Sequence, residues 1–312
     1  MPKILVLMSS YNGEKYIEQQ IESIMNQTIA DDITLRIRDD GSSDGTVNKI
    51  KQLQEKYRFL NKEKIELIIG KNIGYNASFF ELINGINIAE GYSYYSLSDQ
   101  DDIWLKSKLE YAVNSLSSEN DEIPLLYAST SYLVNDDLKP YGQTRRKVRD
   151  FSIYNIAIQN ICPGHTQVFN NSLLKLIKNN NIDVNRIYVY DSWITNYAII
   201  YGKIVFNNSS YTYYRQHMNN QFGYGSGKLG QIYESMQRGK LGDGHKYRKQ
   251  LAYLVECNEN KLREIGACDE LNTIVSAKMF MQRLKYAVKG RFYRQNKVET
   301  LIFYIGFIAG KY

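Results

Sequence analysis

Three groups of acidic side chains have the types and spacing that chemistry on a charged ligand would need. They are Asp39-Asp40, the segment Ser98-Asp99-Gln100-Asp101-Asp102, and Asp191. Carboxylates held on loops by a rigid sheet can bind a divalent cation that neutralises a diphosphate leaving group, and a further carboxylate can accept a proton. These residues therefore indicate a metal-dependent nucleotide site.

Each group also has a purely structural interpretation. Asp101 or Asp102 could cap the helix that follows, Asp191 could cap another helix, and Asp40-Gly41 could form a turn. Position favours the chemical interpretation, because two of the three groups come directly after mostly apolar segments that read as buried strands.

The elements that must hold these groups alternate between strands and helices. Strands are expected at residues 3–8, 33–38, 64–69, 92–97 and 124–134, with shorter ones at 167–169 and 204–206, and helices at 13–26, 44–57, 74–89 and 191–200. Strands separated by helices of this length predict an α/β fold with a mostly parallel sheet. Ligands then bind at the carboxyl ends of the strands.

Length and composition predict one large domain with an appended piece. The chain has 312 residues, and its composition changes to a glycine-rich stretch after Gly223. We expect a catalytic domain over 1–224, with a nucleotide-sugar part at about 1–105 and an acceptor part at about 106–224. A basic, helical C-terminal extension would occupy 225–312.

Charge and cysteine usage narrow the class of protein. The net charge of +6 and the pI of about 8.9 suit anionic ligands or an anionic membrane surface, and are too weak to indicate nucleic acid. Cys162, Cys257 and Cys268 show no CxxC spacing, which favours a reducing, cytoplasmic location. No stretch approaches the ~20 apolar residues of a membrane span, and residues 4–8 read as a strand rather than a signal peptide.

Several motifs occur in an order that resembles a known family. RDDGSSDGT (38–46), KNIGYNASF (71–79) and SDQDDIW (98–104) resemble the blocks of family 2 glycosyltransferases of the GT-A fold. SDQDDIW together with YYRQHMNN (213–220) resembles bacterial rhamnosyltransferases that build cell-surface polysaccharides. The resemblance covers residues 3–220, and it implies a Rossmann-like, mostly parallel sheet flanked by helices.

The resemblance also implies roles for individual residues on the donor side. Asp40, together with Asp39, would accept a hydrogen bond from the pyrimidine N3–H, and Asp101 would be the principal ligand of Mn²⁺ or Mg²⁺, with Asp99 facing both the ribose and the metal. Family members often have Arg and Asn where this chain has Ser78 and Phe79. The remaining donor contacts would come from Ser9, Tyr11, Asn12, Asn72, Gly74 and Gln100.

The implied site also includes four residues from the second half of the chain. Asp191 lies where the family places its catalytic base, and Arg215 would clamp the diphosphate. His217 would complete the metal or diphosphate site, and His165, in a small-residue turn, would bond a sugar hydroxyl. For His165, a simple tight turn is an equal alternative.

Two basic segments admit two interpretations each. The cluster at 145–149 is either a solvated loop or a grip for an anionic acceptor. From Leu271 to Val298 basic and apolar residues alternate without any acidic residue, which fits a helix lying peripherally on the inner face of an anionic membrane. The alternative is a helical pair that packs on the catalytic domain or on a second subunit.

Together these observations predict an inverting glycosyltransferase. Its partners would be a nucleotide-sugar donor, favoured as dTDP-rhamnose, and a hydroxyl of a growing, lipid-linked saccharide. A UDP-hexose donor with the same chemistry is one alternative, and a nucleotide- or saccharide-binding protein without turnover is another. Nucleic-acid binding through the basic C-terminus has no recognisable module to support it.

Overall fold

A nine-stranded sheet forms the centre of the computed structural model, which describes residues 2–60, 64–178, 182–217 and 243–311. Its strands follow the order β3-β2-β1-β4-β8-β6-β9-β5, with β7 (Pro140–Gln143) beside β6. Four neighbouring strands run parallel: β3 (Ile65–Ile69), β2 (Ile33–Asp39), β1 (Ile4–Ser10) and β4 (Tyr94–Ser98). The predicted α/β fold is therefore confirmed.

The other half of the sheet is mixed. Here β8 (Val168–Asn170) lies antiparallel between β4 and β6 (Leu125–Val134), and β9 (Lys203–Arg215) is parallel to β6. The two-residue β5 (Ile103–Trp104) pairs antiparallel with β9. The expected strand at 204–206 is thus much longer, because β9 pairs with β6 as far as Arg215 and with β5 at residues 212–213.

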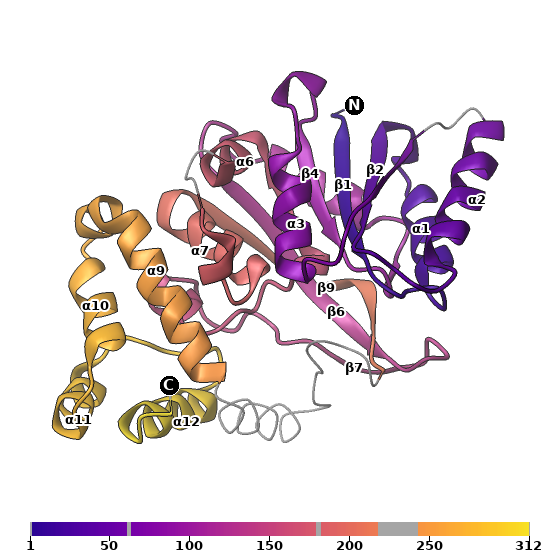
Figure 1. Ribbon diagram of the computed structural model, residues 1–312. Helices are drawn as coiled ribbons and strands as arrows, with labels where there is room; N and C mark the ends of the chain where they lie inside the picture. The colour runs from indigo at the N-terminus through magenta and orange to yellow at the C-terminus, as the bar shows by residue number, and fades with distance from the viewer. Residues whose placement is uncertain (1, 61–63, 179–181, 218–242, 312) are drawn as a thin grey trace.

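Helices cover both faces of the sheet (Figure 1). Alternate side chains of β1 enter two separate cores, Leu5 and Leu7 on one face and Ile4, Val6 and Met8 on the other. This double burial explains the unbroken apolar run of the first strand. The helices that precede β9 are α1 (Ile17–Met25), α2 (Thr46–Phe59), α3 (Tyr75–Asn84), α4 (Lys108–Ser117), α5 (Ile153–Ile156), α6 (Asn171–Lys178) and α7 (Tyr190–Tyr201).

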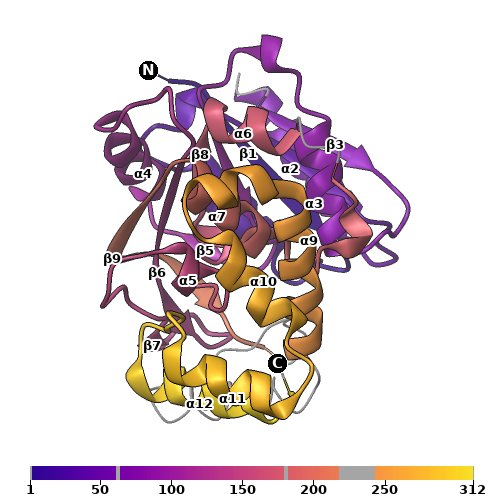
Figure 2. The ribbon, with the colours of Figure 1, turned by 90° about the vertical axis from the view of Figure 1, so that its left-hand side faces the viewer.

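The C-terminal helices gather beside α7, at the end of the molecule away from α2 (Figures 1 and 2). They are α9 (Asp243–Glu264), α10 (Cys268–Ser276), α11 (Phe280–Lys289) and α12 (Lys297–Ile308). Phe303 and Phe307 of α12 are buried in the same core as Trp193 of α7. The expected domain boundary near residue 225 lies outside the described residues, so that division stays a prediction.

Buried polar contacts form a joint between α12 and the segment at residues 145–159. Arg145 Nε donates to Glu299 Oε1 at 3.1 Å, and Gln159 donates to Glu299 Oε2 at 2.8 Å. Since Glu299 is 2% exposed, Arg145 compensates a buried charge. Arg145 is therefore part of the contact with α12. It fits neither of the two interpretations of the 145–149 cluster, which were a solvated loop and a binding site for an anionic acceptor.

None of the helices in the described part of the chain is long and apolar enough to span a bilayer.

Candidate active site

The loops that follow β1, β2 and β4 meet at one edge of the sheet, as the parallel arrangement predicts. Ser10 pairs with Asp39 in register at the ends of β1 and β2. The Tyr11 backbone N–H donates to Gln100 Oε1 at 2.9 Å, and Gln100 Nε2 donates back to the Tyr11 carbonyl at 3.0 Å. A Cβ on Gly13 would lie 2.2 Å from Gln100 Oε1, so only glycine permits this close approach.

Asp39 lies at the centre of the nucleotide-side loops with no exposed surface. Its two oxygens accept hydrogen bonds from Ser10 Oγ at 3.0 Å, from the Ser42 N–H at 2.8 Å and from Ser42 Oγ at 2.6 Å. The Ser42 hydroxyl also accepts the Asn12 N–H at 2.8 Å, which fixes the loop after β1. Asp39 therefore holds two predicted nucleotide loops together.

Asp40 makes an equally complete set of bonds to the next predicted donor segment. Arg38 donates to its Oδ1 at 2.5 Å, and the N–H groups of Ile73 and Gly74 donate at 2.9 Å each. Gly74 has φ 84° and ψ 153°, a conformation that strongly favours glycine, and it begins α3. A pyrimidine that bonds to Asp40 would have to replace one of these hydrogen bonds, so contact of Asp40 with the nucleobase stays a prediction. Contact of the exposed Asn72 with the donor also stays a prediction.

The two positions that depart from the family pattern are buried away from solvent. Ser78 accepts hydrogen bonds from Ser9 Oγ at 2.6 Å and from Arg38 at 3.0 Å. The Phe79 ring stacks on Tyr190 with centroids 4.1 Å apart. These two side chains therefore pack the interior in this chain.

The acidic loop after β4 divides into two clusters. Asp101 Oδ2 lies 2.9 Å from His217 Nε2, and the His217 ring stacks on Tyr16 at a centroid distance of 4.9 Å. Asp99 and Asp102 instead approach His165, whose Nδ1 is 3.7 Å from one oxygen of each. The predicted metal set of Asp99, Asp101 and His217 is thus not brought together as one group. Asp101 and His217 form one pair, and Asp99 belongs to the other cluster.

The cluster of Asp99, Asp102 and His165 has the composition of a cation site. Its ligand atoms all lie within 4.8 Å of one another. Asp102 is fully buried, one of its oxygens has no hydrogen-bond partner, and burial, followed by the charges of Asp101 and Asp99, raises the pKa of its carboxyl well above the usual range. An oxygen-rich set with imidazole suits Mn²⁺ or Mg²⁺, so the residues fit a divalent cation.

The sequence did not indicate Asp102 as a candidate ligand, because the Asp-x-Asp spacing and the family resemblance favoured Asp99 and Asp101. The alternative interpretation, in which Asp101 or Asp102 caps the following helix, is wrong, since α4 begins only at Lys108 and residues 103–104 form β5. The two consecutive aspartates, Asp101 and Asp102, were the feature of the sequence that could have indicated Asp102. His165 is buried and also pairs with Ser131 Oγ at 2.8 Å, and its predicted contact with a sugar hydroxyl stays untested.

Arg215 ends β9 and holds the acidic loop in place. Its guanidinium donates to the Asp101 carbonyl at 2.9 Å, the Asp136 carbonyl at 2.6 Å and Gln19 Oε1 at 2.8 Å, and it lies over the Tyr16 ring. The side chain is buried by these contacts. They position the metal-side loop, while the clamp on a diphosphate stays a prediction.

Asp191 lies in the first turn of α7, 8% exposed. Its Oδ2 accepts the Gly164 N–H at 2.8 Å and its Oδ1 accepts the Ser192 N–H at 2.6 Å. Burial raises the pKa of this carboxyl to about 6, the nearby charge of Asp99 adds to the shift, and the two N–H bonds oppose it. The cap residue of α7 is Val189, so helix capping does not account for Asp191. A carboxylate of this pKa can act as a general base near neutral pH.

Comparison with known proteins agrees with the family resemblance of the sequence motifs. A model described as glycosyl transferase family 2 matches residues 5–176. The dTDP-rhamnosyl transferase RfbG of Shigella flexneri is 31% identical over 228 residues, which cover 69% of this chain and 73% of that protein. The Escherichia coli UDP-Glc:alpha-D-GlcNAc-diphosphoundecaprenol beta-1,3-glucosyltransferase WfgD is 26% identical over 136 residues, 43% of this chain and 48% of its own.

Solved structures support the fold. The mannosyltransferase PcManGT from Pyrobaculum calidifontis, determined in complex with GDP-Man and Mn²⁺, matches with a TM-score of 0.54 and 12% identity, over 100% of this chain and 81% of that one. At this identity the likeness concerns the fold, which is GT-A, as the sequence motifs implied.

Proposed function

Since the chain belongs to glycosyl transferase family 2 and is a glycosyltransferase, we propose that it transfers one sugar, with inversion, from a nucleoside-diphosphate donor to a saccharide hydroxyl. The observation that carries the proposal is Asp191, a buried carboxylate whose pKa of about 6 lets it work as a base at neutral pH. It lies close enough to Asp99 for the two charges to interact.

In the proposed step the acceptor oxygen attacks the anomeric carbon as Asp191 removes its proton. The new C–O bond forms on one face while the bond to the diphosphate breaks on the other, and the bonding electron pair leaves on the diphosphate oxygen. The Gly164 and Ser192 N–H groups hold the Asp191 carboxylate in one orientation, which is the positioning that such a transfer needs.

Asp99, Asp102 and His165 would hold a divalent cation, and the neighbouring pair of Asp101 and His217 would lie on the same acidic loop beside it. When bound, the cation neutralises the negative charge that develops on the diphosphate. The protein's own contribution is to supply carboxylates and imidazoles, some of them already desolvated, so that little reorganisation is required on binding. Mn²⁺ and Mg²⁺ both fit this donor set.

For the donor, dTDP-rhamnose is favoured because the relative from Shigella is named as a dTDP-rhamnosyl transferase. A UDP-hexose remains the alternative. Thermal unfolding with dTDP, UDP, GDP and CMP, each with and without Mn²⁺, separates them, since a ligand at about 100 times its Kd stabilises the folded state by about 2.7 kcal/mol. A metal-dependent shift largest for dTDP supports rhamnose, and one largest for UDP supports the alternative.

A non-catalytic nucleotide-binding protein would tolerate loss of the base. Asp191→Asn should abolish transfer to a saccharide acceptor and leave the Mn²⁺-dependent thermal shift with nucleotide nearly intact. Transfer by this variant at the wild-type rate would contradict the assignment of Asp191.

For the acceptor we propose a lipid-linked saccharide reached at an anionic membrane surface. WfgD is named for a diphosphoundecaprenol-linked acceptor. In this chain Phe280, Leu284 and Val288 of α11 recur every four residues on one exposed helix face, with exposed Lys285 and Lys289 next to them. Three apolar residues of α12 are also exposed, namely Val298, Leu301 and Ile305. Exposed apolar and cationic side chains together suit anionic lipid headgroups.

Sedimentation with vesicles tests this surface. We expect binding to phosphatidylglycerol-containing vesicles that weakens with salt, and little binding to phosphatidylcholine alone. Leu301→Glu should reduce it at least tenfold, whereas Leu60→Glu should not, because Leu60, at 57% exposed against 60% for Leu301, lies at the end of α2. Equal loss in both variants, or none in either, would contradict the proposed surface.

A further inference from the structure

The backbone that leads into Asp191 depends on side chains from elsewhere in the chain. Residues 187–189 belong to no helix or strand, and α7 begins at Tyr190. In the described part of the chain, the N–H groups of residues 188–190 and the carbonyls of Ile187 and Tyr188 make no backbone–backbone hydrogen bond, and buried backbone groups need partners. Two amide side chains supply them.

Asn76 supplies partners from the donor side. Its Nδ2 donates to the carbonyls of Tyr188 at 2.7 Å and Ile187 at 3.2 Å, and its Oδ1 accepts the Tyr190 N–H at 2.9 Å. Asn76 lies in the first turn of α3, two residues after Gly74, whose N–H bonds to Asp40. The predicted donor segment and the base are therefore joined through one side chain.

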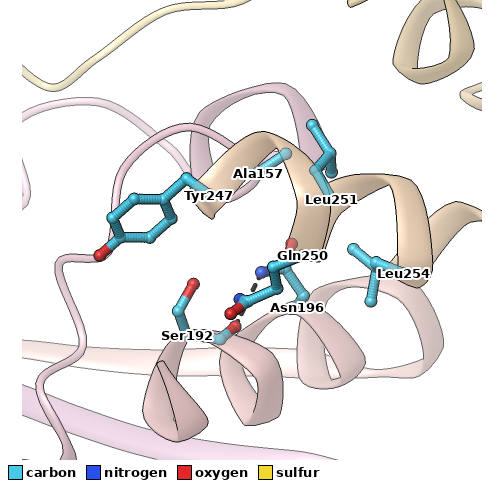
Figure 3. A pocket seen from close by; sticks show the side chains of 7 residues that line it. All are labelled: Ala157, Ser192, Asn196, Tyr247, Gln250, Leu251 and Leu254. Carbon is cyan, nitrogen blue, oxygen red and sulfur yellow. Dashed lines mark hydrogen bonds between the residues drawn. The ribbon is translucent and has the colours of Figure 1, made fainter. Parts of the chain in front are cut away.

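Gln250 supplies partners from the C-terminal extension. Its Oε1 accepts the N–H groups of Tyr188 at 2.8 Å and Val189 at 2.9 Å, and the side chain is 4% exposed. Figure 3 shows Gln250 on α9 near Ser192 and Asn196 of α7, at a small pocket between the two helices. Stacking of Tyr253 on Trp193, with centroids 5.2 Å apart, keeps α9 against α7.

We infer that Asn76 and Gln250 are positioning residues for Asp191, which they orient by hydrogen bonding to the backbone of residues 187–190. The C-terminal extension thereby takes part in catalysis without touching the substrate. This inference rests on the proposed function, in which Asp191 is the base. A misplacement of about 1 Å at a reacting group can cost about 100-fold in rate, so loosening this segment should act mainly on kcat.

Gln295 provides a matched control. It too belongs to the C-terminal extension, is 5% exposed, and accepts two consecutive N–H groups through Oε1, those of Val148 at 2.8 Å and Arg149 at 2.7 Å. These bonds lie in the joint with α12 rather than before α7. Gln250→Leu and Gln295→Leu therefore remove the same kind of interaction at two different places.

Transfer kinetics with dTDP-rhamnose, or with the donor that the nucleotide shifts identify, and thermal unfolding are measured on the full chain. We expect Gln250→Leu to lower kcat about 10- to 100-fold while the donor KM stays within about twofold. Gln250→Glu, which keeps an acceptor oxygen, should recover most of the loss. Gln295→Leu should lower the melting temperature by a similar amount and keep kcat within about twofold. If Gln250→Leu does not fold, Gln250→Asn, which withdraws the acceptor by one methylene, replaces it with the same expectations.

Wild-type kcat in the Gln250 variant, or equal losses of kcat in the Gln250 and Gln295 variants, would overturn the inference while leaving the proposed function standing. Asp191→Asn, assayed in parallel, reports on the proposed function itself. Full activity in that variant would overturn both.

Discussion

The pH dependence of transfer tests the base most directly. With a pKa of about 6, Asp191 is about nine-tenths ionised at pH 7 and about one-tenth ionised at pH 5, whereas a carboxyl at the ordinary 3.8 would stay mostly ionised at both. We therefore expect kcat at saturating donor, acceptor and Mn²⁺ to fall about tenfold between pH 7 and pH 5. The assay follows release of the nucleoside diphosphate.

Two controls separate the base from other groups that titrate in this range. Nucleotide and Mn²⁺ affinity, measured over the same pH values, shows whether binding of the donor or the metal changes with pH. The second control is stability. A raised carboxyl pKa favours the folded state at low pH, and that contribution is lost as pH rises from about 4 through about 6. The wild type should therefore lose up to about 3 kcal/mol relative to Asp191→Asn across this window.

A flat kcat between pH 7 and pH 5, with donor and metal saturating throughout, would refute the reasoning. The reasoning would also be refuted if the free energies of unfolding of the wild type and of Asp191→Asn changed equally between about pH 4 and pH 6. Folding would then not shift the pKa of the Asp191 carboxyl.

Two further predictions concern the metal and the donor loop. Asp102→Asn should raise the melting temperature without metal at neutral pH, because it removes a buried carboxylate whose pKa burial raises, and should weaken the Mn²⁺-dependent shift with nucleotide; an unchanged Mn²⁺ response would exclude Asp102 from the site. Gly74→Ala should cost about 1–3 kcal/mol in urea unfolding from backbone strain alone, since a Cβ there meets nothing within 4 Å; a cost near zero would show that the loop relaxes.

The sequence predicted the half of the site that depends on parallel strands. The unbroken apolar run at residues 4–8 predicted a buried strand, and polar residues after the parallel strands were expected to meet at one edge of the sheet. The contact between Tyr11 and Gln100 and the bond from Ser10 to Asp39 agree with that rule, although the sequence did not predict these individual bonds. Local periodicity was sufficient because a helix follows each of the first three strands and returns the chain to the same end of the sheet, so that the strands run parallel.

The other half depends on pairings that periodicity does not encode. His165 reaches Asp99 and Asp102 because β8 inserts antiparallel beside β4, with Tyr95 opposite Phe169, and the turn at 164–166 directly precedes that strand. Nothing in a three-residue strand specifies which neighbour it joins or in which direction.

The pairing of β5 with β9 also positions the acidic loop that precedes β5. Ile103 lies opposite Tyr213, and the pairing continues into an N–H bond from Arg215 to Asp102. The same register sets the Arg215 side chain against the Asp101 carbonyl, and His217, two residues farther on, reaches the Asp101 carboxylate. A one-residue slip would turn each of these side chains to the opposite face. Two residues of β5 therefore fix Asp101 and Asp102 relative to the end of β9, which explains how a strand this short brings together Asp101 and His217, two residues more than a hundred positions apart in the chain.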